Sequence, residues 1–226
     1  MIPKAAGKQR SRGTLGDLRP IELPKPMVKR SKSVAAALRL RRSIREISAR
    51  RLPLQTLSNL LWAACGINRK SSPFRVPGRT AASASNSQEI DVYVALEEGT
   101  YQYHPLPHRL VPVAAGDLRG LAIGRGQAGW GDNAPVRLIF VADIDKLVNT
   151  SGFQEPGLHN PRVQRSYYYV DTGLIAANVY LFAAAAGLAA WFHNCDRSRL
   201  HAKLSLRSDQ RVLFGQTIGY PLAKTR

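Results

Sequence analysis

Three arginines and a serine fall within five residues of the chain, at Arg41, Arg42, Ser43 and Arg45. Guanidinium groups bind phosphate oxygens through paired, charge-assisted hydrogen bonds, and a serine hydroxyl adds one more donor. The cluster therefore fits a phosphate monoester. Taken alone, it fits a solvated run of surface charge better, because exposed cations need no ligand.

Two further segments contain residues that could bind a ligand. The segment 79–89 is rich in small and amide side chains, including Ser83, Ser85 and Asn86, which can form directional hydrogen bonds while the backbone approaches a planar group. At the end of the chain, Lys224 and Arg226 follow a predicted strand. An ordinary loop and a frayed basic tail are the alternatives for these segments.

Several well-known catalytic motifs are absent from the sequence. No Gly-x-Gly-x-x-Gly, Walker loop or His-Glu-x-x-His occurs, so dinucleotide-fold, phosphoryl-transfer and zinc-hydrolase functions lack their residues. The five histidines are scattered, and Cys65 and Cys195 each stand alone among apolar residues. We therefore expect no metal site, and we interpret both cysteines as buried thiols.

The net charge of +18 is concentrated near the N-terminus. Residues 1–50 contain 14 Lys or Arg and three acidic residues, a net of +11, which leaves +7 for the remainder. Gly, Ser and Thr are interspersed among Lys4, Lys8, Arg10 and Arg12, prolines follow at positions 20, 24 and 26, and no aromatic residues are present there to stack on bases. Residues 1–32 are therefore predicted to be a flexible basic arm. A basic nucleic-acid-binding protein remains the alternative from another functional class, and it is not favoured.

No run of about 20 apolar residues occurs, and the N-terminus has no apolar signal segment. We expect a cytoplasmic protein without a membrane span. The remaining residues, 33–226, are long enough for one domain.

Helical periodicity identifies the elements that position the arginine cluster. A first helix is predicted from Ser33 and ends where Arg41 begins the cluster. A second is predicted from Pro53 to a stop at Gly66. The longest helix signal, Asp171–Ala186, is apolar nearly all round, which predicts burial on several sides, by the sheet and by a partner.

The strand signals follow a different period. Residues 90–96 and 100–104 alternate around a turn at 97–99, which predicts a β-hairpin. Continuous apolar runs at 136–142 and 212–220 are typical of central strands.

In this order, the segments resemble the nitroreductase family, in particular the SagB-type branch of oxidases that accompany peptide cyclodehydratases. The resemblance covers roughly residues 33–226. It rests on the arginine cluster and on four further segments, namely Leu57–Ala64, Ser83–Asn86, Asp171-x-Gly173 with Asn178, and Gly219–Pro221.

The resemblance implies an α+β fold, with a central mixed, mainly antiparallel sheet flanked by helices and a long buried helix at the interface of a homodimer. It also implies bound FMN, with the family's phosphate-binding roles falling on Arg41, Arg42, Ser43, Arg45, Lys224 and Arg226. In the family, a serine-rich loop from the other subunit lines the flavin, and a segment after the buried helix runs beneath its ring. The matching residues are Ser83, Ser85 and Asn86 for the loop, and Phe192, His193 and Asn194 for the segment.

The implied activity is reduction of a nitroaromatic, quinone or related small-molecule acceptor by NADH or NADPH, in ping-pong fashion. The alternative is a dehydrogenase or oxidase acting on a peptide azoline or another small organic substrate. No catalytic side chain is expected, because the flavin performs the chemistry. The sequence departs from the family pattern at Ala82, at Ser87 and along Trp191–Asn194, and these positions bear on the substrate and the flavin potential.

Overall fold

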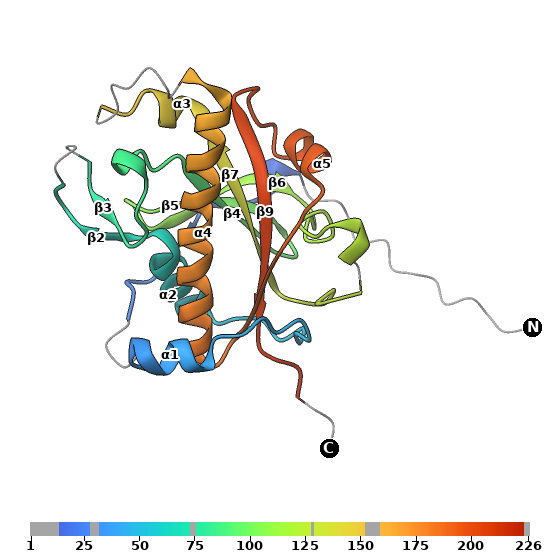
Figure 1. Cartoon of the computed structure of the whole chain (residues 1–226). Helices are drawn as coiled ribbons and strands as arrows, with labels where there is room; N and C mark the ends of the chain where they lie inside the picture. Colours follow the sequence, from blue (N-terminus) through green and yellow to red (C-terminus); the bar gives the residue numbers. More distant parts are fainter. Residues whose placement is uncertain (1–13, 28–31, 73–75, 128, 152–158, 224–226) are drawn as a thin grey trace, which may run out of the picture.

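The structure is a computed structural model that describes residues 14–27, 32–72, 76–127, 129–151 and 159–223. One antiparallel sheet dominates it, with a long helix lying along one face (Figure 1). The strands in chain order are β1 (Ile21–Glu22), β2 (Ile67–Arg69), β3 (Gly78–Arg79), β4 (Ile90–Ala95), β5 (Gly99–His104), β6 (Arg109–Ala115), β7 (Val136–Asp143), β8 (Ala189–His193) and β9 (Gln210–Gly219). The helices are α1 (Val34–Leu40), α2 (Leu54–Cys65), α3 (Ile144–Val148), α4 (Pro161–Ala186) and α5 (Arg197–Lys203), with 3-10 turns η1 (Leu15–Asp17), η2 (Ala84–Asn86) and η3 (Arg125–Gln127).

Seven strands form the main sheet in the order β1-β6-β5-β4-β7-β9-β8. Each pairing between these described strands is antiparallel, which confirms the expected α+β fold and its mainly antiparallel sheet. The predicted hairpin forms as β4 and β5, and the two apolar runs form the adjacent strands β7 and β9. β2 and β3 make a separate two-stranded sheet.

Both faces of the central strands are covered by helices. Val92 and Phe140 pair across β4 and β7 and belong to the core beneath α2 and α4, whereas the next pair, Tyr93 and Ile139, belongs to the core beneath α5. Because successive strand residues point to opposite faces, a strand buried on both sides reads as a continuous apolar run. Cys65 and Cys195 are buried free thiols, as predicted.

α4 is longer than its apolar signal and begins at Pro161, after the Asn160 cap. It ends at Gly187, whose φ of 69° is a conformation that glycine adopts without strain. By length and composition α4 could cross a membrane, but core helices pass the same test, and α4 packs on α1, α2 and β8. The helix is therefore weak evidence for a membrane span.

Part of the expected N-terminal arm belongs to the fold. Ile21 and Glu22 form the edge strand β1, which pairs with β6, and Leu23 is buried. The backbone amide of Met27 donates to the Asn59 side chain at 2.8 Å. The prediction of a flexible arm is therefore wrong for residues 14–27, because backbone pairing and one buried side chain hold them. Residues 1–13 and 28–31 lie outside the described residues.

Candidate functional site

The arginine cluster lies along the free edge of β8. After α1 the chain becomes extended, and the amide of Ile44 donates to the carbonyl of Ala190 at 3.0 Å. Three residues later, Ile47 forms a β-bridge with Pro221, just beyond β9. The segment 41–47 is thus held between an edge strand and the end of the last strand, so its side chains gather in one place.

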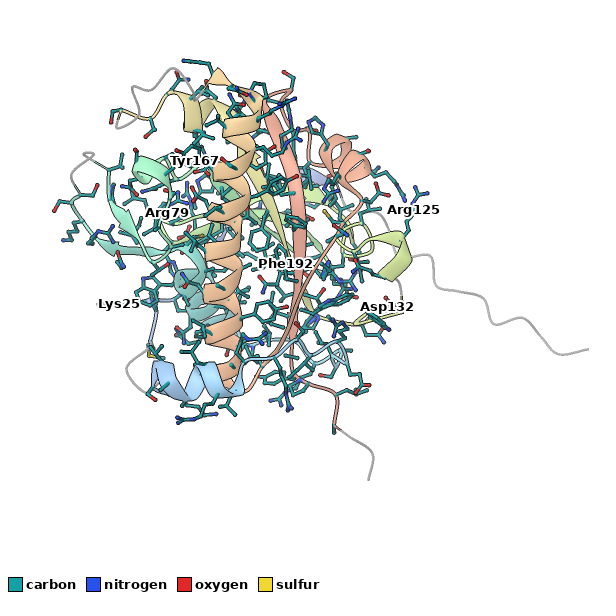
Figure 2. All side chains as sticks on the ribbon, in the orientation of Figure 1. Lys25, Arg79, Arg125, Asp132, Tyr167 and Phe192 are labelled. Carbon is teal, nitrogen blue, oxygen red and sulfur yellow. The ribbon has the colours of Figure 1, made fainter. Side chains whose placement is uncertain are left out.

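Tyr180 of α4 joins this segment to β8. Its hydroxyl accepts the backbone amide of Phe192 at 2.8 Å and lies 2.9 Å from the hydroxyl of Ser43. The guanidinium of Arg41 lies 5.6 Å from the centre of the Tyr180 ring, within cation–π range. Figure 2 shows Phe192 between α4 and β9, where it packs against Phe140 and Phe214.

A pocket of about 870 Å³ opens beside the cluster. Arg45 lines this pocket. Its guanidinium carbon lies 5.3 Å from the ring centre of Trp130 and 5.5 Å from that of Trp191. Trp130 is 52% exposed, so part of this aromatic side chain remains accessible beside the pocket. The lining residues are Arg42–Ile47, Gly129–Asn133, Pro221 and Leu222.

The charges in this region are unevenly paired. None of the ion pairs between described residues involves Arg41, Arg42 or Arg45. Glu46 and Asp132 also line the pocket, and both oxygens of Asp132 lie 3.1 Å from the donating amide of Gly129. The guanidinium groups are therefore available to an anion, while Asp132 is engaged by its own turn.

Phe192, His193 and Asn194, the residues expected beneath the flavin ring, have different environments in the structure. The amide of Phe192 is occupied by Tyr180. His193 is buried, with Nε2 2.7 Å from the Thr217 hydroxyl and Nδ1 2.9 Å from the Asn194 carbonyl. Asn194 is exposed, and its side-chain oxygen accepts from Arg197 at 3.3 Å. The side chain of His193 is therefore engaged within the protein.

The serine-rich loop does not line this pocket. Its turn η2 carries Ser85 and Asn86 at φ of 47° and 57°, and the Ser83 hydroxyl accepts the Gln88 amide at 3.0 Å. The Asn86 side chain donates to the Ser72 hydroxyl at 3.1 Å. The loop follows β3, and Figure 2 shows Arg79, the last residue of β3, on the opposite side of α4 from Phe192.

The structure thus brings together Arg41, Arg42, Ser43, Arg45 and Phe192 along one edge of the sheet. Lys224 and Arg226 lie outside the described residues.

Sequence reasoning missed Tyr180 and Trp130. Tyr180 could have been found in the sequence, because it is the single hydroxyl-bearing residue within the apolar run 179–186. A buried tyrosine hydroxyl usually forms a hydrogen bond.

The described fold is thus an antiparallel sheet with a long helix on one face, and the basic pocket at its edge suits an anionic ligand. Residues 38–220 match the sequence profile of the Nitroreductase family. The chain belongs to the nitroreductase family.

Similarity to individual proteins supports the same family assignment. A protein of Methanocaldococcus jannaschii described as a nitroreductase is 30% identical over 155 residues, which cover 66% of this chain and 71% of that protein. A Ralstonia eutropha JMP134 crystal structure, also described as a nitroreductase, is 36% identical, with a TM-score of 0.77 over 93% of this chain and 92% of the other.

A more distant structural neighbour is a chain of the Escherichia coli microcin synthetase McbBCD complex, solved with truncated pro-MccB17 bound. It is 19% identical, with a TM-score of 0.64 over 79% of this chain and 68% of the other. At this identity the likeness concerns the fold.

Proposed function

We propose that the protein is an FMN-dependent oxidoreductase that takes electrons from NADH or NADPH and passes them to a nitroaromatic, quinone or related acceptor. The observation that carries the proposal is the set of Arg41, Arg42, Ser43 and Arg45 along the edge of β8, beside a pocket of about 870 Å³. Three guanidinium groups without an ion-pair partner among the described residues suit one terminal phosphate.

The pocket also suits the rest of an FMN molecule. Its volume lies within the range of about 300–1,000 Å³ that is usual for cofactor sites. Trp130 and Arg45 offer flat groups for stacking, and Gly129 and Gly131 leave backbone without side chains in the wall. Glu46 would repel a phosphate, so we assign the phosphate to the end of the site near Ser43 and Arg41.

Bound FMN would supply the electron and hydride transfer chemistry. The residues of this chain would hold and orient it, and the guanidinium groups of Arg41, Arg42 and Arg45 would stabilise negative charge in the site. We assign no general acid or base, since His193 is buried with both ring nitrogens engaged.

We further propose a homodimer in which each flavin site is completed by the Ser83–Asn86 loop of the other subunit. Support comes from α4, where Val170 is 61% exposed and Leu174 42% exposed in the single chain. An apolar face of this kind on the longest helix suits a subunit interface. Light scattering at micromolar concentration should give twice the mass of the chain, and a monomer would refute this part of the proposal.

The first experiment asks whether the protein binds FMN. Acid precipitation of the purified protein should release FMN, or FMN titration of apoprotein should give a saturable spectral change. Arg41→Ala should weaken FMN binding by about 1–3 kcal/mol, the cost of losing a charge-assisted hydrogen bond. Arg39→Ala is the matched control, because Arg39 is an equally exposed arginine that lies on α1, outside the cluster and the pocket lining. Protein that neither carries nor binds FMN would refute the proposal.

The second experiment concerns the electron donor. In anaerobic stopped flow, NADH or NADPH should bleach the flavin absorbance before any acceptor is added, and steady-state kinetics should be ping-pong. If neither nicotinamide bleaches the flavin while a small organic substrate such as a peptide azoline does, the dehydrogenase function replaces the reductase.

A further inference from the structure

The hydroxyl of Tyr180 takes part in two hydrogen bonds, and the direction of one of them is fixed by its donor. The amide of Phe192 can only donate, so the phenol oxygen of Tyr180 is its acceptor at 2.8 Å. The phenol has one hydrogen of its own. The adjacent Ser43 oxygen lies 2.9 Å away and can accept it.

In the pair of Ser43 and Tyr180 either hydroxyl can donate, and the two directions leave Ser43 in different states. When Ser43 accepts from Tyr180, its own hydroxyl hydrogen is left to donate elsewhere. Ser43 lines the pocket together with Arg42 and Arg45, which are donors without acceptor capacity. Among the described residues no hydrogen bond joins the Ser43 hydroxyl to Glu46 or Asp132, the carboxylates of the same lining. The hydrogen of Ser43 can therefore meet an acceptor supplied by a ligand. Each hydrogen bond in such a chain polarises the next, which strengthens the last donor.

Tyr180 is well placed to maintain this arrangement. It projects from α4, a helix of 26 residues that packs on α1, α2 and β8. The Arg41 guanidinium lies 5.6 Å from its ring centre, so the ring contacts one end of the arginine cluster while the hydroxyl contacts Ser43. One side chain thereby connects α4, the edge of β8 and the segment 41–47.

We propose that Tyr180 is a positioning residue that holds Ser43 as a hydrogen-bond donor to the phosphate of the bound flavin nucleotide. This inference rests on the proposed function and extends it by naming the group that sets the hydroxyl direction. Tyr180 acts through Ser43 and needs no contact with the ligand. It follows that Tyr180 contributes to binding of the phosphate more than to binding of the ring.

The test compares FMN with riboflavin, which lacks the phosphate, in full-length protein. Tyr180→Phe keeps the ring beside Arg41 and removes the hydroxyl. It should weaken FMN binding roughly three- to tenfold, the usual range for one hydrogen bond, and leave riboflavin affinity unchanged. Tyr169→Phe on the same helix is the matched control, since no hydrogen bond of its hydroxyl occurs in the described part of the chain. It should leave both affinities unchanged.

A double-mutant cycle separates positioning from general structural damage. Ser43→Ala should weaken FMN binding at least as much as Tyr180→Phe, and adding Tyr180→Phe to Ser43→Ala should cause little further loss, because the two residues act through one hydrogen bond. Additive effects, equal losses for FMN and riboflavin, or unchanged FMN affinity in Tyr180→Phe would each overturn the inference. Failure of the wild-type protein to bind FMN would instead refute the proposed function.

Discussion

The carboxylate of Asp171, on α4, accepts a hydrogen bond from the backbone amide of Ala84 at 3.0 Å. This bond ties the long helix to the turn η2, in which Ser85 and Asn86 have φ of 47° and 57°. Non-glycine residues in the left-handed region cost of order 1–2 kcal/mol each, so such a turn depends on contacts that hold it. Asp171 supplies one of these contacts.

Asp171→Ala should therefore release the turn and destabilise the protein by about 1–3 kcal/mol, the cost of losing a partly buried hydrogen bond to a carboxylate. Urea unfolding measures the stability, and hydrogen exchange at the Ala84 amide measures the local effect. Asp171→Asn is the matched control, because its amide oxygen can still accept the hydrogen bond. Equal exchange of the Ala84 amide in wild type and Asp171→Ala would show that the bond does not hold the turn.

A second buried carboxyl, Glu89, lies close to Asp171. Burial, together with the nearby Asp171 carboxylate, raises the pKa of Glu89 from 4.5 to about 7. The folded protein then binds this proton more tightly than the unfolded chain does. Its contribution to stability is complete below the unfolded pKa of 4.5, and it is lost as the pH rises through about 7.

Between these two pH values, the Glu89 contribution to the free energy of unfolding should fall by up to about 1.4 kcal/mol per pH unit. Glu89→Gln imitates the neutral carboxyl and should remove this slope. The measurement is urea unfolding of both proteins from pH 4.5 to 8, in which the difference between them isolates Glu89. Parallel curves across this range would contradict a raised pKa.

The N-terminal segment provides a prediction about stability. Deleting residues 1–27 removes β1, the buried Leu23 and the bond from Met27 to Asn59. Burial of one leucine is worth about 1.5–3 kcal/mol, so this deletion should lower the free energy of unfolding by at least that amount. Deleting residues 1–13 alone is the control and should leave stability unchanged. Equal stability of the two truncated proteins would show that β1 contributes nothing.

Periodicity predicted the main elements of the fold because their apolar positions are regular. It missed β6, which contains Pro112, a residue that argues against a strand because it cannot donate to the ladder. The register shifts opposite this proline, between Thr100 and Tyr101, and the strand accommodates it there. The start of α4 was also missed, because Arg162 and Arg165 in its first turns interrupt the apolar signal.

The site could be predicted only where its residues are close in sequence. Arg41, Arg42, Ser43 and Arg45 are recognisable together, and the structure gathers them at one edge. The partner of Ser43, Tyr180, is 137 residues away in sequence, and only the packing of α4 against β8 brings the two together. No local pattern encodes such a contact.

The last prediction concerns His193, a histidine beside the proposed flavin site whose ring could exchange protons only if it were accessible. The carbonyl of Asn194 can only accept, so Nδ1 carries the hydrogen, and Nε2 accepts from the Thr217 hydroxyl. Burial, with a smaller effect of Arg137, lowers the pKa of His193 to about 4. Its contribution to stability should therefore be complete above the ordinary pKa of 6.5 and be lost as the pH falls through about 4.

In NMR spectra, the His193 ring should remain a neutral Nδ1–H tautomer from pH 5 to 8, with its Nε2 resonance unchanged over that range. The pH dependence of flavin reduction should then contain no His193 ionisation, and Thr217→Val should shift the Nε2 resonance by removing its donor. Thr100→Val on β5 is the comparison, since Thr100 is equally buried and its hydroxyl forms no hydrogen bond within the described part of the chain. A His193 ring that titrates near pH 6.5 would show that the imidazole is accessible to protons and able to act as an acid in the site.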